Sequence, residues 1–224
     1  QLQTQIESLS YYSSADYAIG TIIDIPLRKQ TKRAVVIDSK PVSMTKTAVK
    51  TATFSLKKLP EQDKLSTLPP ALIETARRLT KTVPSSLGAI IFSLLPPEIR
   101  EGDAELECNL PCIGTYETPS VNILQGTTEE RLRTYRSHIR ETFAHRGSVL
   151  LVVPTSADVT RLAESLCTGI ENRLITFSST HTKKKLEKAY ADLSDLSHAK
   201  LIITTPTYCC LDRHDICLLY TSPS

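Results

Sequence analysis

Tryptophan is absent from this 224-residue sequence, and aromatic residues make up only 5% of it. With so few rings available, we expect cores built from leucine, isoleucine, valine and alanine. No run of about 18 apolar residues occurs, which predicts that no helix spans a membrane. Residues 1–20 also lack a basic start followed by an apolar core, so no secretory signal is predicted. These absences favour a cytoplasmic protein without a membrane partner.

The cysteines do not follow a metal-binding pattern. They are scattered, which favours free thiols in a cytoplasmic protein over a disulfide framework. Cys108 and Cys112 have half of a zinc-site spacing, but no second pair or histidine lies at ligand spacing. We therefore predict no metal site. The six are Cys108, Cys112, Cys167, Cys209, Cys210 and Cys217.

Positive charge is concentrated at the start of the chain, although the net charge is only +3. Nine lysines and arginines face four acids in residues 1–60. This excess suggests an anionic partner, and a merely solvated lysine face is the alternative. The cations are Arg28, Lys29, Lys32, Arg33, Lys40, Lys46, Lys50, Lys57 and Lys58.

Residues 1–60 are predicted to form a small β-rich domain. The expected strands are residues 9–13, 21–27, 34–37 and 54–59, with a basic turn at 28–33. A linker rich in proline and polar residues follows. Helices are then expected over residues 72–83 and 86–95. Residues 61–97 have the size of a winged-helix module, and a plain two-helix packing unit reads the same way.

A second linker is predicted over residues 98–119, and strand, helix and strand over residues 120–154. The apolar run Val121–Leu124 is the first strand, Thr127 and Glu130 form a capping box, and Val149–Val153 is a buried strand. Further helices (157–167, 182–196) and strands (173–177, 200–205) alternate after it. This order predicts a parallel sheet with helices on its faces.

The turn at Gly126 lies where a βαβ unit binds a nucleotide phosphate. A phosphate loop needs several glycines, a lysine and a hydroxyl residue for magnesium. Gly126, Thr127 and Thr128 occupy this position, but no second glycine and no lysine follow. The two glutamates in the first helical turn would also repel a triphosphate. The sequence therefore predicts a degenerate nucleotide site.

Two other sets of polar residues are weak catalytic candidates. His138 and His145 share a helix face but lack a carboxylate or cysteine partner, and Ser178, Ser179 and His181 are neighbours only in sequence. We interpret both sets as exposed polar residues. Lys183–Lys185 are interpreted as a solvated helix start that is able to touch DNA.

The order of these segments resembles the primosomal protein N-prime (PriA) family of replication-restart helicases. The similar stretches in the β-rich part are Leu9–Ser13, Gly20–Arg28 and Ala34–Ile37, followed by Leu72–Pro96 with Leu94-Leu-Pro-Pro97. Those in the later part are Leu124–Gly126, Val149–Pro154 and Leu201–Thr205. The resemblance implies a 3′-DNA-end-binding domain, a winged-helix module and an incomplete RecA-like helicase lobe over residues 120–219.

The resemblance also implies which residues bind DNA. The family's 3′-end pocket falls on Leu9, Ser10, Tyr11, Arg28 and Lys50, with Lys29, Lys32 and Arg33 as basic neighbours. The family often has an aromatic and an acidic residue at the first two positions and a glycine at the position of Arg28. Forked or single-stranded DNA, primosome proteins and single-strand-binding proteins are the implied partners.

The family uses ATP, magnesium and zinc, but the residues for them are missing from this sequence, so no cofactor is expected. A strand is expected near Ile216–Leu219, and Tyr220–Ser224 do not match the family's acidic ATP motif. Residues 220–224 resemble translated sequencing-adapter sequence, and we expect the natural chain to diverge near Ile216 and continue. Three functions stay open: a DNA-binding restart protein that does not hydrolyse ATP, an active 3′-5′ helicase in full-length form, and a protein-interaction scaffold.

Overall fold

The computed structural model describes residues 8–41, 56–62, 66–101, 120–209 and 213–221. The chain is mixed α/β and divides into two compact units, residues 1–108 and 109–224. Both the predicted β-rich domain and the predicted helical module lie in the first unit. Their separation at residue 60 stays a prediction.

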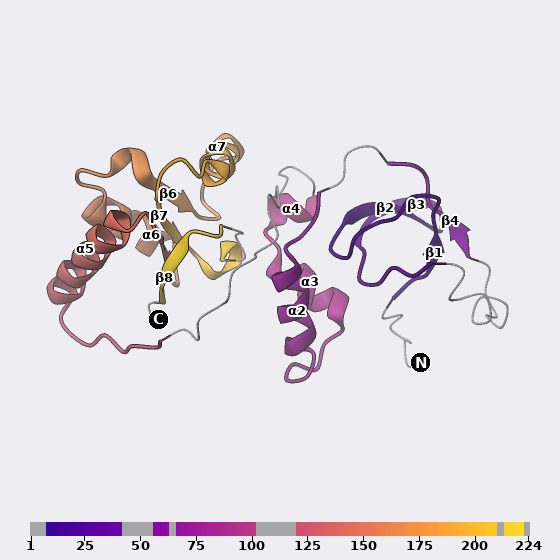
Figure 1. Cartoon of the computed structure of the whole chain (residues 1–224), viewed down its shortest axis with the longest axis horizontal. Helices are drawn as coiled ribbons and strands as arrows, with labels where there is room; N and C mark the ends of the chain where they lie inside the picture. Colours follow the sequence, from indigo (N-terminus) through magenta and orange to yellow (C-terminus); the bar gives the residue numbers. More distant parts are fainter. Residues whose placement is uncertain (1–7, 42–55, 63–65, 102–119, 210–212, 222–224) are drawn as a thin grey trace. The chain divides into compact units, whose positions relative to one another are not determined.

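The first unit is built on an antiparallel hairpin of β2 (Ile22–Leu27) and β3 (Gln30–Val35). Alternate residues of β2, Ile23 and Ile25, are buried with Tyr17 and Leu59 in a small apolar core. The short strands β1 (Tyr11–Tyr12) and β4 (Lys57–Lys58) form a separate parallel pair (Figure 1). The predicted basic turn over 28–33 is wrong in length, because β3 already begins at Gln30 and only two residues form the turn.

Helices follow the strands in the first unit, and proline sets where two of them begin. Helix α2 (Pro70–Leu79) starts with proline in its first turn, where a missing N–H costs no hydrogen bond. Ser86 caps α3 (Leu87–Leu94) by accepting from the Ala89 N–H. A further helix, α4 (Pro97–Glu101), occupies the start of the predicted linker, so the linker assignment is wrong for these residues.

The second unit contains a four-stranded parallel sheet, as the alternating pattern predicted. Its strand order is β6-β7-β5-β8, with all three pairings parallel. The strands are β5 (Ser148–Val152), β6 (Leu174–Phe177), β7 (Leu201–Thr204) and β8 (Ile216–Thr221). The residues beyond the expected Ile216–Leu219 strand, Tyr220 and Thr221, thus belong to β8.

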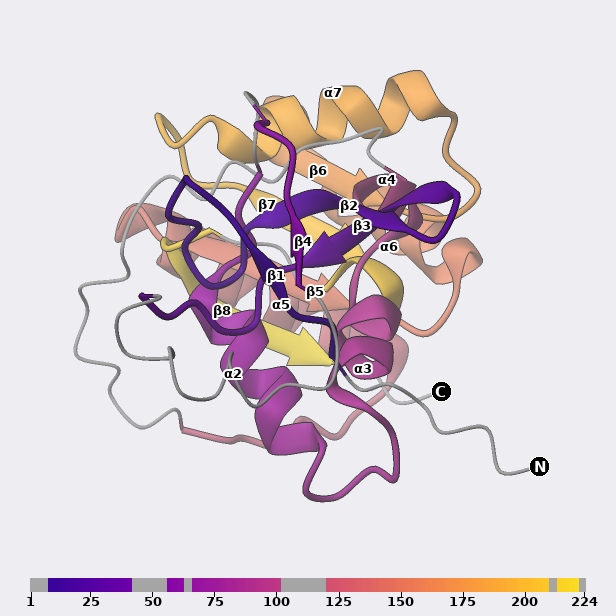
Figure 2. The ribbon, with the colours of Figure 1, turned by 90° about the vertical axis from the view of Figure 1, so that its right-hand side faces the viewer.

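Helices cover both faces of this sheet, as Figures 1 and 2 show. Helix α5 (Thr128–Ala144) and α6 (Ser156–Leu166) pack on Val149, Leu151 and Ile203. Helix α7 (Lys183–Ser194) lies on the other face, where the Tyr190 ring is 5.0 Å from the Phe177 ring. The short 3₁₀ turns Glu171–Arg173 and Pro206–Tyr208 flank β6 and β7.

The predicted strand Val121–Leu124 is wrong. Residues 120–125 form no strand, and Val121 and Ile123 are 89% and 87% exposed. A strand needs the free main-chain edge of a neighbour, and an apolar run by itself does not supply one. The strand–turn–helix unit that would hold a phosphate therefore lacks its strand.

Candidate nucleic-acid interface

The turn of the β2–β3 hairpin presents a cluster of cations that we call the basic hairpin: Arg28, Lys29 and Lys32. All three side chains are exposed, and none has an ion pair within the described part of the chain. Leu27 pairs with Gln30, so the turn has only two residues, Arg28 and Lys29. Figure 2 shows the ribbon of the β2–β3 hairpin. Both cations at the turn are consequently available to an anionic ligand.

Arg28 has a left-handed backbone, with φ of 56°. A positive φ at the first residue of a two-residue hairpin turn is the type II′ pattern, where glycine is usual. A side chain in this conformation costs about 1 kcal/mol. The basic side chain at the end of the hairpin is thus held at a conformational cost.

Arg33 differs from the basic hairpin, although it is only one residue from Lys32. Successive residues of a strand point to opposite faces, so these two cations lie on opposite sides of the ribbon. The Arg33 Nε lies 3.9 Å from Asp24 Oδ1, and its Nη1 donates to the Ile99 carbonyl oxygen at 3.4 Å. Arg33 therefore connects the hairpin to helix α4, and we assign it a structural role.

The remaining predicted DNA-binding residues are only partly brought together. The Tyr11 hydroxyl donates to the Pro26 carbonyl oxygen at 3.1 Å, which holds β1 against the end of β2 two residues before Arg28. Leu9, at 45% exposed, and Ser10 lie on the surface just before Tyr11. Lys50 lies outside the described residues. The Tyr11 side chain packs on the apolar core, which makes it a support for the surface.

The predicted capping box at the start of α5 is confirmed, and it places a carboxylate at the terminus of the helix. Glu130 Oε2 accepts from the Thr127 N–H at 2.8 Å and from the Thr127 hydroxyl at 2.9 Å. These bonds, the backbone one first, hold the pKa of Glu130 below its ordinary value. The helix terminus therefore already carries a carboxylate of its own.

Gly126 leaves room for the Glu130 carboxylate. A Cβ atom at this position would lie 3.0 Å from Glu130 Oε2, so glycine allows the close approach of the side chain. Thr128 is the first residue of the helix and is exposed. Among the described residues of this turn, nothing replaces the missing lysine and glycines. The geometry fits a self-capped helix better than a nucleotide site.

Hydroxyl groups line the carboxyl edge of the parallel sheet, and their proximity was not predicted from the sequence. Ser156 begins α6 after β5, and its Oγ lies 3.4 Å from the Oγ of Ser179, which follows β6. Ser178 is only 1% exposed and its hydroxyl bonds the Thr180 hydroxyl, so its assignment as an exposed residue is wrong. Ligands of parallel α/β sheets bind at this edge.

Two of the three histidine candidates differ from the expectation as well. His181 is half-buried, its Nδ1 is buried without a hydrogen-bond partner, and burial lowers its pKa. His138 is half-buried beside the Tyr220 hydroxyl, whereas His145 is exposed as expected. The signal that places His181 at the carboxyl edge is its position just after a buried strand.

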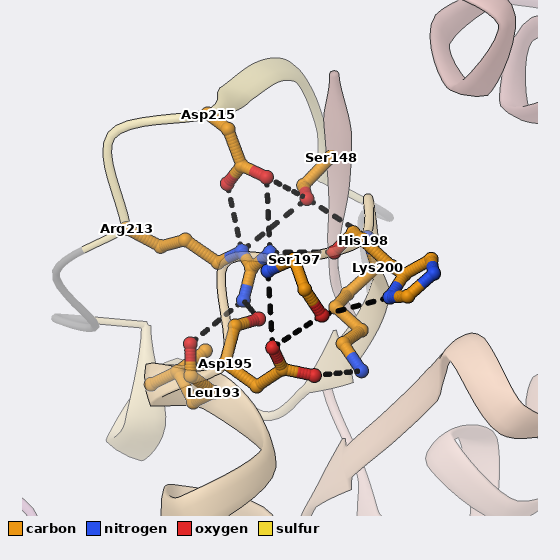
Figure 3. A network of polar contacts seen from close by, with 8 residues as sticks. All are labelled: Ser148, Leu193, Asp195, Ser197, His198, Lys200, Arg213 and Asp215. Atoms are coloured by element: carbon orange, nitrogen blue, oxygen red, sulfur yellow. Dashed lines mark hydrogen bonds and ion pairs between the residues drawn. The ribbon is translucent and has the colours of Figure 1, made fainter. Parts of the chain in front are cut away.

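The most extensive polar network lies at the opposite, amino edge of the sheet (Figure 3). The Arg213 side chain is completely buried, and it pairs with Asp215 through Nε–Oδ1 at 2.7 Å. Its other nitrogens donate to the carbonyl oxygens of Leu193 at 2.7 Å, Asp195 at 2.9 Å and His198 at 2.8 Å. With its N–H groups used within the chain, Arg213 is a structural residue.

Ser148 joins this network to the strands. Its hydroxyl donates to Asp215 Oδ2 at 2.7 Å and accepts from the Lys200 N–H at 2.9 Å. The amino ends of β5, β7 and β8 are thereby tied to the end of α7. This set was not predicted from the sequence, where its local signal is an arginine two residues before an aspartate at the start of a strand.

The described residues contain no group of three or more potential metal ligands and no helix long and apolar enough to cross a membrane. Cys167, Cys209 and Cys217 form no disulfide among these residues, whereas Cys108, Cys112 and Cys210 lie outside them. In comparisons with known proteins, no family model and no curated protein matches the chain. The function is therefore inferred from the structure, and the basic hairpin is the strongest candidate site.

Proposed function

We propose that this chain is a DNA-binding protein of the replication-restart type, related to the PriA family, and that its α/β unit does not hydrolyse ATP. The observation that carries the proposal is the basic hairpin, whose three exposed cations have no ion pair among the described residues. Lysine and arginine side chains that are not neutralised within a protein supply the phosphate contacts of nucleic-acid binding.

The finer fold assignments belong to this proposal. Residues 1–60 act as a 3′-DNA-end-binding domain, residues 61–97 as a winged-helix module, and residues 120–219 as an incomplete RecA-like lobe. The Glu130 carboxylate at the start of α5 supports a lobe that does not bind nucleotide. The Ser156 and Ser179 hydroxyl groups at the carboxyl edge of the sheet are a second set of groups suited to DNA phosphates.

The test is binding of the full chain to a fluorescent DNA fork. The fork has a free 3′ leading-strand end or the same end blocked, and each is measured at several salt concentrations. We expect the double variant Lys29→Ala, Lys32→Ala to bind more weakly and to lower the salt slope by about two units, one per lost phosphate contact. Lys81→Ala, which removes an exposed lysine after α2, is the matched control and should bind like the wild type.

Each function left open predicts a different result. Preference for the free 3′ end supports a restart protein, whereas no binding at low salt would favour a scaffold. Unchanged affinity and slope in the double variant would remove the basic hairpin from the interface. Binding of ATP by the chain would contradict the nucleotide-silent lobe and favour a helicase.

A further inference from the structure

The exposed ring of Tyr12 is the feature of the first unit that the basic hairpin does not explain. Tyr12 is 46% exposed, although tyrosine rings usually pack against other side chains. Its neighbour Tyr11 faces the apolar core. Because successive side chains of a strand alternate, Tyr12 points away from the core.

The pairing of β1 with β4 places a lysine beside this ring. Tyr12 is in register with Lys58, and paired residues of neighbouring strands point to the same face. The Leu59 N–H donates to the Tyr12 carbonyl oxygen at 2.9 Å, which keeps the two short strands together. Lys58 is exposed and has no ion pair among the described residues.

In the described β-rich part that contains this pair, unpaired cations outnumber unpaired acids. In the described β-rich part, Lys57 and Lys58 join the three cations of the basic hairpin as exposed and without an ion pair. Of the four acids described in this part, Asp24 is paired with Arg33 and Asp38 with Lys40, whereas two, Asp16 and Glu61, have no ion pair among the described residues. An aromatic face among unpaired cations is complementary to a base and its phosphate.

We propose that Tyr12 and Lys58 form a platform on which a base of single-stranded DNA stacks, with Lys58 contacting the adjoining phosphate. The inference rests on the proposed DNA binding and adds the residues that distinguish single strands from duplex. In duplex DNA the base faces are covered by their neighbours, so a protein ring stacks only on unpaired bases. Tyr11, predicted as a DNA contact, supports this surface from below.

The absence of tryptophan provides a direct test. Tyr12→Trp introduces the only indole in the full chain, and its emission should be quenched when a fluorescently silent oligothymidine is added. Tyr12→Ala should weaken binding of the same oligonucleotide by about 5- to 150-fold, the range for loss of one stacked base. Lys58→Ala should lower the salt slope by about 0.7, which corresponds to one phosphate of a single strand.

Phe92→Trp is the matched control. Phe92 is also an exposed aromatic residue, 60% exposed, with the Arg100 guanidinium 4.3 Å from its ring centre. It lies on helix α3, whereas Tyr12 lies on strand β1. The emission of this variant should not change when the oligothymidine is added.

The possible results separate this inference from the proposed function. Suppose that the wild type binds oligothymidine, but the emission of Tyr12→Trp and the affinity of Tyr12→Ala stay unchanged. The platform is then wrong, and the DNA-binding proposal stands. Equal quenching of the Tyr12→Trp emission by duplex would also overturn stacking on unpaired bases. If the wild type binds no DNA at low salt, both proposals fail.

Discussion

Arg213 in the second unit and Arg28 in the first unit are used in opposite ways. In the second unit, Arg213 is buried and bonds three carbonyl oxygens and the Asp215 carboxylate. In the first unit, Arg28 is exposed, has no ion pair among the described residues and takes a left-handed backbone. The difference teaches that an arginine whose donors are satisfied within the chain holds the fold together. An exposed arginine whose donors have no partner in the described chain, and whose backbone conformation costs free energy, is a candidate for ligand binding.

The two turns that the sequence analysis singled out show the same contrast. At Thr127, the main-chain N–H and the hydroxyl are bonded by the chain's own Glu130, which puts a negative charge where an external anion would bind. At Arg28 and Lys29, the described residues offer no anion at all, and the turn is open to one. We therefore propose the hairpin as the interface, because its charge is not satisfied within the described residues.

Removal of Arg213 should have the largest effect. Arg213→Ala leaves the largely buried Asp215 carboxylate without its partner, and we expect a loss of about 3–5 kcal/mol in the free energy of unfolding. Arg213→Lys keeps the charge but has fewer donors, so its loss should be intermediate. Urea unfolding followed by circular dichroism measures both variants.

The exposed ion pair of Arg161 with Asp158 provides the control for this prediction. Arg161→Ala should change the free energy of unfolding by no more than about 1 kcal/mol. If Arg213→Ala costs no more than Arg161→Ala, the network of Figure 3 does not hold the amino edge of the sheet together.

Arg28→Gly should raise the stability of the fold while it weakens DNA binding. Glycine takes the left-handed φ without strain, so the variant should be more stable by up to about 1 kcal/mol, although glycine also gains entropy in the unfolded chain. Its binding to forked DNA should weaken, with a salt slope lower by about one unit. Urea unfolding and a salt titration on the same preparation measure the two effects.

Lys29→Gly removes the same charge from the other turn residue, which has no left-handed φ. It should therefore weaken binding in the same way but lower the stability. A loss of stability in Arg28→Gly as well would show that the conformation of Arg28 is not strained.

The smallest expected effect is the contribution of Asp195 to the pH dependence of the free energy of unfolding. Hydrogen bonds from the Ser197 hydroxyl and N–H, aided by Lys200, lower the pKa of Asp195 from 3.8 to about 2. The folded state thus favours the charged carboxylate. Its contribution to stability is complete above the ordinary pKa of 3.8 and is lost as the pH falls through about 2.

Asp195→Asn removes this titration while it keeps the main-chain carbonyl that Arg213 uses. The stability difference between wild type and variant should be constant near neutral pH and shrink in acid. Urea midpoints measured over a pH series give this difference. Parallel pH profiles for the two proteins would show that Asp195 does not couple protonation to folding.

The regular elements of the second unit were largely predictable because their signals are local. The capping box of Thr127 and Glu130, the apolar stripe of α5 and the buried runs of β5 and β7 all depend on residues close together in sequence. Alternation of these helices and strands also predicted a parallel sheet, since parallel strands need a crossover between them.

Sequence alone therefore determined where most helices and strands lie and that the Gly126 turn lacks phosphate-binding residues. Only the tertiary structure decided that Val121–Leu124 pair with no strand and that Arg213 is buried while Arg28 is exposed. It also decided that Tyr12 is turned to solvent while Tyr11 packs on the core. The physical reason is that helix caps and apolar periodicity are local. Strand pairing and charge satisfaction depend on partners that only the folded chain brings together.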